Sequence, residues 1–410
     1  MTRTVDGRAV QIIDPGRLNT DAGPDFFNAK IAIDGRVWAG DVEIHVRASD
    51  WHRHGHDTDP AYKSVILHVV DRDDTAVSRP NGEIIPQMRM ACAPDFSRHY
   101  CELVDRADRS LPCEDTLRSL EKIYLTDWLD SLAFERIYAK ADHIGSLLER
   151  LNGDWESVCY VAVARSLGFG INGDPFERLA LSTPLRSLAR HRDSLFTLEA
   201  LLFGQSGLLD SGRFRGDDYV ECLRKEYAFI AGKFGLRKVE SPGWKMARMR
   251  PPNFPHRRVA TLAAMLHQGI HILSRVLEVR DMEDAMRIFT PELTGYWMSH
   301  YSFGVPSAPS LSALSRSSVA GLVINAVVPL QTAYGLSHGD RSMTDRAVEL
   351  LESLPAEHNS IVELFRRAGL KITNAFLSQG VIQMRRAYCE NRKCLYCRVG
   401  HRMLAAKAPR

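Results

Sequence analysis

The spacing of hydrophobic residues divides the chain into two parts. From Val10 to about Arg89 the apolar stretches are short and alternate with polar residues, as in VQIID, AKIAI, VWAGDVEIHV and SVILHVV. Stretches of this kind, separated by Gly, Pro, Asn and Asp, are typical of β-strands. Asp34-Gly35 and Asn81-Gly82 are two-residue turn signals, so we expect a hairpin at each.

After Cys92 the apolar residues recur at intervals of three and four, which is the spacing of amphipathic helices. The longest pattern runs from Leu117 to Arg150, and further ones follow as far as Tyr388. We therefore predict an α+β protein. A mixed β-sheet module over residues 1–110 is followed by a large all-α domain over residues 111–410, which ends in a cysteine-rich motif.

One strand of the first part carries polar residues on one face. Side chains alternate along a strand, so Asp41, Glu43 and His45 share a face, and we expect the opposite, apolar face to be the buried one. Asp25 follows a Gly23-Pro24 breaker, which allows its carboxylate to approach Glu43. Two such carboxylates are suited to Mg²⁺ or Mn²⁺, which prefer oxygen ligands.

The order Gly23-Pro24-Asp25, hairpin, Glu43-Ile44-His45, short helix and apolar strand resembles the core of the PD-(D/E)XK nuclease superfamily. The resemblance implies that Asp25 and Glu43 bind the catalytic Mg²⁺ or Mn²⁺, and that His45 stands where the family has a lysine. A neutral imidazole acts as a base but brings no permanent positive charge to the scissile phosphate. A tolerated variant, a lysine supplied by Lys30 or Lys63, and an inactive site are all consistent with this departure.

A second resemblance covers nearly the whole chain. The run IIDPGRLNTDAGPDFFNAKI, with GDVEIHV, WHRHGHD, VILHVV and the terminal CLYCRVG, is similar to a bacterial family known as domain of unknown function 2851. That family implies no particular reaction.

Histidines follow the strand that carries Glu43. In WHRHGHD we expect His54 and His56 to contact a metal or a substrate phosphate, because they follow the proposed catalytic edge. Exposed histidines in a loop without such a role are the alternative.

The segment from Lys245 to Arg258 is rich in cations and bounded by prolines. Arginine pairs bidentately with phosphate, so the segment predicts a surface that follows a nucleic acid backbone. A solvated charged face is the alternative. The substrate-binding candidates are Arg248, Arg250, Arg257 and Arg258.

The C-terminal sequence Cys389-x4-Cys394-x2-Cys397-x3-His401 predicts a metal site, because zinc takes four sulfur or nitrogen ligands. Either His401 or the distant Cys113 is expected as the fourth ligand. A few PD-(D/E)XK enzymes carry an iron–sulfur cluster on three C-terminal cysteines and one upstream cysteine, and resemblance to them implies a cluster instead. Reduced cysteines without metal are the third alternative.

The composition is that of an ordinary soluble protein: 410 residues, 45% hydrophobic, 25% charged, with a formal net charge of +3. No run approaches the roughly 20 apolar residues that cross a bilayer, and the N-terminus lacks a secretion-signal pattern. We therefore expect a cytoplasmic protein without a membrane partner. The sequence indicates no oligomeric state.

These observations predict a Mg²⁺- or Mn²⁺-dependent nuclease that hydrolyses phosphodiester bonds in DNA or RNA, with Asp25, Glu43 and His45 as catalytic residues. The alternative is a catalytically inactive nucleic-acid-binding or assembly protein that retains the nuclease-like fold. A hydrolase of small phosphorylated substrates would share the same site.

Overall fold

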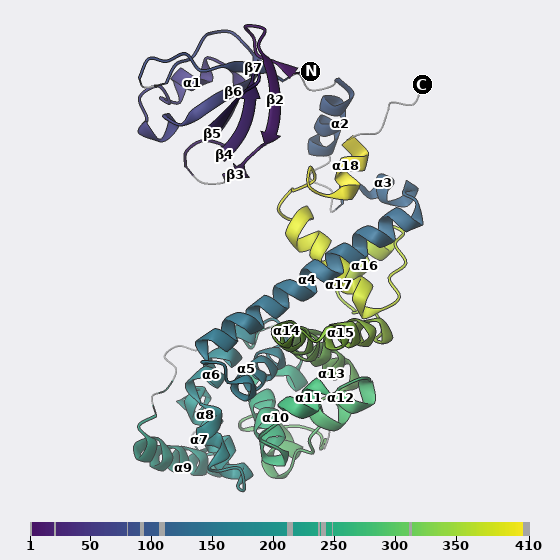
Figure 1. Ribbon diagram of the computed structural model, residues 1–410. Helices are drawn as coiled ribbons and strands as arrows, with labels where there is room; N and C mark the ends of the chain where they lie inside the picture. The colour runs from purple at the N-terminus through teal and green to yellow at the C-terminus, as the bar shows by residue number, and fades with distance from the viewer. Residues whose placement is uncertain are drawn as a thin grey trace. The chain divides into compact units, whose positions relative to one another are not determined.

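The computed structural model in Figure 1 describes residues 2–19, 22–79, 81–90, 94–105, 111–210, 216–236, 238, 243–247, 249–310 and 314–404. The chain forms two compact units. The N-terminal unit comprises Met1–Pro112 with Met403–Arg410, and the helical unit comprises Cys113–Arg402. The division after Pro112 lies close to the limit at residue 110 that we expected from the change of pattern.

The N-terminal unit is built on a seven-stranded mixed sheet. Its strands follow the order β1-β2-β4-β5-β6-β7, and β3 pairs with β4. The pairs from β1 to β5 are antiparallel, whereas β5–β6 and β6–β7 are parallel. A bridge between Thr4 and Met88 links the two ends of this order, so the sheet is nearly barrel-shaped (Figure 1). The elements are β1 (Thr2–Arg3), β2 (Ala9–Asp14), β3 (Arg17–Leu18), β4 (Phe26–Ile33), β5 (Arg36–Arg47), α1 (Asp50–Arg53), the 3₁₀ turn η1 (Pro60–Tyr62), β6 (Val65–Arg72), β7 (Gln87–Arg89) and α2 (Pro94–Asp105).

The first predicted turn is confirmed. Asp34 and Gly35 both have positive φ angles, 48° and 80°, as the twisted two-residue turn between β4 and β5 requires. The second prediction is confirmed only locally. Gly82 has a φ of 82° and donates a hydrogen bond to the carbonyl of Arg79, but the segments beside it form a single bridge, Ser78–Ile84, rather than two strands.

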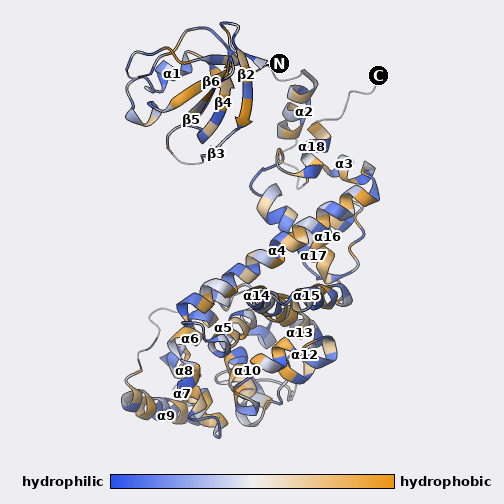
Figure 2. Cartoon of the chain, viewed as in Figure 1, coloured by the Kyte–Doolittle hydropathy of each residue, from blue (hydrophilic) through white to orange (hydrophobic). Residues whose placement is uncertain are grey.

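From Asp41 to Val46, our expectation for the faces of β5 was wrong except at Val42, which is buried as predicted. Asp41 and Glu43 are buried at 7% and 5% exposure, whereas Val46 is 65% exposed. The polar face is the covered one because α1 and η1 bring aromatic side chains to it, among them the fully buried Trp51. Figure 2 shows that β6, by contrast, is hydrophobic along most of its length, as the VILHVV stretch predicted.

The order of hairpin, short helix and parallel strand agrees with the sequence pattern. The strands β1, β3 and β7 and the curling of the sheet go beyond that pattern. The mixed sheet is therefore established, and a nuclease fold stays a prediction.

The helical unit is not entirely helical, because β8 and β9 form a small antiparallel ribbon. The first half contains α3 (Glu114–Ser119), α4 (Lys122–Arg150), α5 (Trp155–Leu167), α6 (Gly173–Ser182), α7 (Leu185–Ala189), α8 (Leu195–Gln205), η2 (Leu208–Asp210), α9 (Asp218–Phe234), η4 (Pro251–Asn253) and α10 (Pro255–Gln268). The second half contains α11 (Leu273–Leu277), α12 (Met282–Phe289), η5 (Gly295–Met298), β8 (His300–Ser302), β9 (Val305–Pro306), α13 (Arg316–Leu322), the π-helix η6 (Val323–Val327), α14 (Val328–His338), α15 (Arg341–Ser353), α16 (Ser360–Arg367), α17 (Ala375–Gln383), the π-helix η7 (Met384–Cys389) and α18 (Arg398–Leu404).

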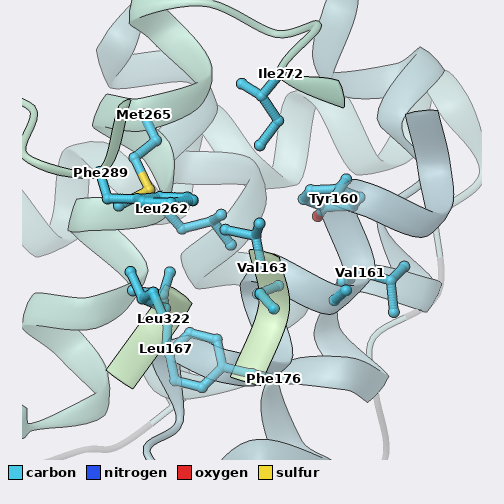
Figure 3. Close-up of a cluster of buried hydrophobic side chains, with 14 of the residues drawn as sticks. Tyr160, Val161, Val163, Leu167, Phe176, Leu262, Met265, Ile272, Phe289 and Leu322 are labelled. Atoms are coloured by element: carbon cyan, nitrogen blue, oxygen red, sulfur yellow. The ribbon is translucent and has the colours of Figure 1, made fainter. Parts of the chain in front are cut away.

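The core of this unit surrounds α5, whose residues from Val158 to Ala164 are all buried. Figure 3 shows side chains of α5 together with those of α6, α10, α12 and α13, including Phe176, Leu262 and Phe289. A helix that is apolar on every side is expected at the centre of a large domain. The helical spacing in the sequence therefore led correctly to a packed helical core.

The continuous helical run Arg316–His338 is long and apolar enough to cross a membrane by length and composition. Our expectation that no such run exists was therefore too strict. The window is 72% buried inside the protein, which explains its apolar character by packing. Lys140 of α4 donates hydrogen bonds to the carbonyl of Ile324, at 3.2 Å, and to Oδ1 of Asn325, at 2.9 Å, within the π-helical part of this run.

A carboxyl group lies inside the helical core. Glu199 of α8 is 6% exposed and accepts a hydrogen bond from the hydroxyl of Tyr219 on α9. Burial raises the pKa of Glu199 to about 7 from its usual value of 4.5. The folded protein therefore retains a proton on Glu199 at pH values where the unfolded chain has released it.

We predict that Glu199→Gln changes the pH dependence of stability. Between pH 4.5 and 7 the folded state binds the additional proton, so the contribution of Glu199 to the free energy of unfolding falls as the pH rises through this window. The amide does not titrate, so stability of the wild type relative to the variant should fall by about 3 kcal/mol from pH 4.5 to 7. Urea unfolding followed by tryptophan fluorescence measures this difference. The exposed Glu149→Gln is the matched control, and parallel pH profiles for wild type and Glu199→Gln would contradict the prediction.

Candidate metal centre

The two carboxylates that the sequence singled out do lie together in the N-terminal unit. Asp25 immediately precedes β4, and the next residue, Phe26, pairs with Val42 of β5. The backbone N–H of Asp25 donates to Oε2 of Glu43 at 3.1 Å, and Oδ2 of Asp25 accepts from the N–H of Ile44 at 2.9 Å. The edge of the hairpin thus holds each carboxylate through one oxygen, as the bend at Gly23-Pro24 led us to expect.

Asp41, the third acid of this strand, has a structural role. Its carboxylate accepts hydrogen bonds from the N–H of Asn28, at 3.0 Å, and from the hydroxyl of Ser64. These bonds join β5 to β4 and to the start of β6. Asp41 is therefore occupied on both oxygens, and the chemistry of the site lies with Glu43 and its neighbours.

Three imidazoles form a compact group beside Glu43. One ligand atom from each of His45, His54 and His56 lies within 4.8 Å of the other two. Nε2 of His45 is 3.1 Å from Nδ1 of His54. Oε1 of Glu43 is 3.4 Å from Nε2 of both His45 and His56. The loop after β5 therefore folds back so that WHRHGHD meets the polar face of the strand.

These distances fit a single transition-metal ion. Ligand atoms at 2.0–2.1 Å from a tetrahedral zinc are separated by about 3.4 Å, close to the spacings beside His45. Imidazole nitrogens suit zinc, iron and similar metals, whereas Mg²⁺ prefers oxygen. The arrangement places His45 among residues that could bind one metal ion, and its place at the lysine position of the PD-(D/E)XK motif stays a prediction. Coordination of Mg²⁺ or Mn²⁺ by Asp25 and Glu43 stays a prediction.

His68 on β6 contacts the histidine group through His45, and the sequence pattern did not identify it as part of the site. It lies on β6 directly opposite Glu43 in the parallel register. Its Nε2 is 2.9 Å from Nδ1 of His45, and the side chain is fully buried. A metal-binding imidazole commonly has its other nitrogen fixed in this way. The available signal was a single polar residue in the otherwise apolar stretch VILHVV.

Aromatic side chains enclose the inner side of the histidine group. The ring of Tyr62 stacks on that of His56 with centroids 3.7 Å apart, and Trp51 meets the rings of His56 and His68 at 5.4 and 5.3 Å. His54 remains exposed, so the group is closed on one side and open to solvent on the other.

Burial shifts the pKa values of His45, His68 and Glu43 away from their usual values. It lowers the pKa of His45 to about 4, helped by the charges of His56 and His54. It likewise lowers the pKa of His68 to about 3. His45 and His68 are then neutral at pH 7, and the neutral imidazole is the form that binds a metal. Burial together with the charge of Asp25 raises the pKa of Glu43 to about 7.

Two of the predicted substrate-binding arginines are interior residues. Arg257 and Arg258 are each 2% exposed on α10. Arg257 donates to the backbone carbonyls of Trp297 and Ser310, and Arg258 lies over the ring of Phe169 at 4.7 Å. Both therefore stabilise the helical unit, and neither is placed to contact a polymer at the surface. The cation-rich sequence suggested an exposed segment, but helix α10 begins at Pro255 and buries Arg257 and Arg258.

The other two arginines differ. Arg250 is exposed at the start of η4, which is compatible with the predicted role. Arg248 lies outside the described residues.

Cys113, one of the two residues considered as a fourth ligand, lies near the C-terminal cysteines. The charges of Cys397 and Cys394 contribute, after burial, to raising the pKa of Cys113 to about 12, so these sulfurs lie near one another. The side chain of His401 is exposed on α18. Of the two fourth ligands that we considered, the structure brings Cys113 to the group.

Comparison with models of known protein families matches residues 1–360 to the family described as Protein of unknown function (DUF2851). The chain belongs to this family. The matched range of the DUF2851 chain includes the histidine group and Cys113, and it ends before the C-terminal cysteines. No curated protein and no solved structure matches the chain. Membership in DUF2851 names no reaction, and the resemblance to PD-(D/E)XK nucleases stays a prediction.

We predict that His45→Ala abolishes binding of one Co²⁺ ion by the protein, because it removes the central nitrogen of the group. Co²⁺ reports the ligand type, since thiolates add a near-ultraviolet charge-transfer band that nitrogen and oxygen ligands do not give. The sulfur-free spectrum should therefore disappear in this variant. His68→Phe, which removes the support of His45, should weaken binding by about 10- to 100-fold.

The matched control is His52→Ala, because His52 is an exposed histidine of the same segment that pairs with Asp57 at 3.5 Å. It should bind Co²⁺ as the wild type does. Equal loss in His52→Ala and His45→Ala would contradict the assignment of ligands.

Proposed function

We propose that this protein is a metal-dependent hydrolase that cleaves phosphodiester bonds in nucleic acid, with its active site in the N-terminal unit. The observation that carries the proposal is the convergence of His45, His54 and His56 beside the buried carboxylate of Glu43. Three protein nitrogens with a further position left for water or substrate are typical of catalytic rather than structural zinc sites.

When bound, a metal of this kind lowers the pKa of a coordinated water and polarises a phosphoryl oxygen. His45, His54 and His56 would hold it through their imidazole nitrogens. His68 would fix the orientation of His45 through the 2.9 Å contact between their rings.

Glu43 is the group we assign to proton transfer. A general base works best with a pKa near the working pH, and burial and the charge of Asp25 bring the pKa of Glu43 to about 7. Its Oε2 is held by the N–H of Asp25, so Oε1 remains on the side of the imidazoles. In this proposal Glu43 accepts the proton of the attacking water, and Asp25 positions it and raises its pKa.

The open side of the site suits a phosphate group. Arg53 is exposed, and a guanidinium nitrogen lies 3.5 Å from Nε2 of His54. Arg47, at the end of β5, is also exposed. Guanidinium groups pair well with phosphate oxygens, and the enclosed side behind Trp51 leaves this as the direction of approach.

Nucleic acid is the substrate class that the sequence order favours. Asp25, Glu43 and His45 follow the sequence order of the PD-(D/E)XK motif, with histidine in place of its lysine. We also propose a cytoplasmic location, supported by the free thiols of the cysteines that the structure describes.

We predict that Glu43→Gln retains the metal but cleaves single- and double-stranded DNA and RNA about 10²- to 10⁴-fold more slowly than the wild type, because it removes the proton acceptor. His45→Ala should lose both metal and cleavage, and chelation should stop the wild type. His52→Ala should keep full activity. Fluorescent oligonucleotide cleavage in the presence of Zn²⁺, Mn²⁺ or Mg²⁺ measures these rates.

The same set of variants separates the alternatives. Cleavage by Glu43→Gln at the wild-type rate would refute the role of this residue. Salt-dependent binding of nucleic acid by a wild type that cleaves none of the substrates would support the inactive binding protein instead. Hydrolysis restricted to small phosphodiesters would change the substrate class.

A further inference from the structure

The helical unit begins and ends with cysteines that meet. Cys113 is the first residue of the unit and immediately precedes α3. Cys389 ends the π-helix η7, and Cys394 and Cys397 lie in the turns before α18. Almost the whole helical unit therefore separates Cys113 from the other thiols along the chain.

The thiols are grouped and mostly shielded from solvent. Cys397 is 6% exposed, and Cys113 and Cys389 are partly buried. The charges of Cys113, Cys397 and Cys394 all contribute, after burial, to a raised pKa of Cys389. All are free thiols rather than disulfides. A buried group of thiols, with no disulfide among the cysteines that the structure describes, favours metal binding.

Specific contacts hold the C-terminal segment against α4, near the end where α3 and Cys113 lie. The ring of Tyr388 meets that of Trp128 edge-on at 5.5 Å, and the guanidinium of Arg398 lies 5.0 Å from the centre of the same ring. Arg398 also pairs with Asp127. These residues flank the cysteines on both sides along the chain, so the approach of the thiols to Cys113 is fixed by neighbouring side chains.

Gly400 brings α18 close to the same group. A Cβ atom at this position would lie 2.1 Å from the carbonyl oxygen of Cys394. Only glycine permits this approach of the helix to the cysteine turn. The turn is therefore built to a tight geometry, as metal-binding cysteine turns are.

We infer that Cys113, Cys389, Cys394 and Cys397 bind a thiophilic metal centre that joins the two ends of the helical unit. Four cysteine sulfurs are the ligand set of structural zinc sites and of iron–sulfur clusters. No three of these sulfurs lie within 4.8 Å of one another among the described residues. A single zinc ion would draw them closer, whereas a cluster holds its thiolates farther apart because several irons and sulfides lie between them.

The centre is independent of the histidine group in the N-terminal unit. Its ligands come from the helical unit alone, and its role is to connect chain ends rather than to bind substrate. Connecting residues so distant in sequence removes many conformations from the unfolded chain, which stabilises the folded unit.

The test is the metal content of the full-length protein purified without oxygen, measured for zinc, iron and acid-labile sulfide. In the wild type we expect the cysteine group to hold one zinc ion per chain, or iron with sulfide and visible absorption, in addition to any metal at the histidine group. Cys113→Ser and Cys397→Ser should lose most of this metal and melt at lower temperature. Cys222→Ser, at an exposed cysteine of α9, is the matched control and should keep it.

His45→Ala should also keep the metal of the cysteine group, so failure of this inference is distinguishable from failure of the proposed function. A wild type without stoichiometric zinc or iron, or equal metal in wild type and Cys113→Ser, would overturn the inference. If the cysteine variants do not fold, titration of wild-type thiols with an organomercurial decides the question. Release of metal in step with the thiols supports the centre, and release of none overturns it.

Discussion

The parallel pairing of β5 with β6 is the constraint on which the candidate site depends. It places His68 opposite Glu43, and the antiparallel pairing of β4 on the other side of β5 places Asp25 beside the same residue. Three polar groups from separate strands thereby meet under a cover of Trp51 and Tyr62. Polar groups buried in this way cost free energy unless they find partners, and here Glu43 accepts from the N–H of Asp25 while Nε2 of His68 pairs with His45.

This burial explains the chemistry of the group. An exposed Glu43 would be an ordinary ionised carboxylate, and exposed histidines would titrate near pH 6.5. Removal from water shifts the pKa of Glu43 upward and those of His45 and His68 downward, so their usual order of protonation is reversed. Sites with such opposed shifts are frequently functional.

Local features of the fold were predictable from sequence because neighbouring residues determine them. The Asp34-Gly35 turn and the strands beside it follow from residue type, and α4 ends at Arg150, the predicted end of the longest helical pattern. The approach of Asp25 to Glu43 was also foreseen. The covered face of β5 was not, because α1 and η1 decide it from elsewhere in the chain. The same limit applies to His68, to the burial of Arg257 and to the choice of Cys113 over His401, each of which depends on packing between distant segments.

The contact between Lys140 and the π-helical turn has a consequence for how the longest apolar helix packs. A π-turn leaves a carbonyl oxygen free of its usual partner, and here the ammonium of Lys140 meets the carbonyl of Ile324. Sliding the helix by one residue would rotate that oxygen by about 100° and move it by about 1.5 Å. Apolar surfaces alone tolerate such slippage, whereas a cation aimed at one oxygen does not. The hydrogen bonds of Lys140 therefore favour one alignment of α4 with the helical run Arg316–His338.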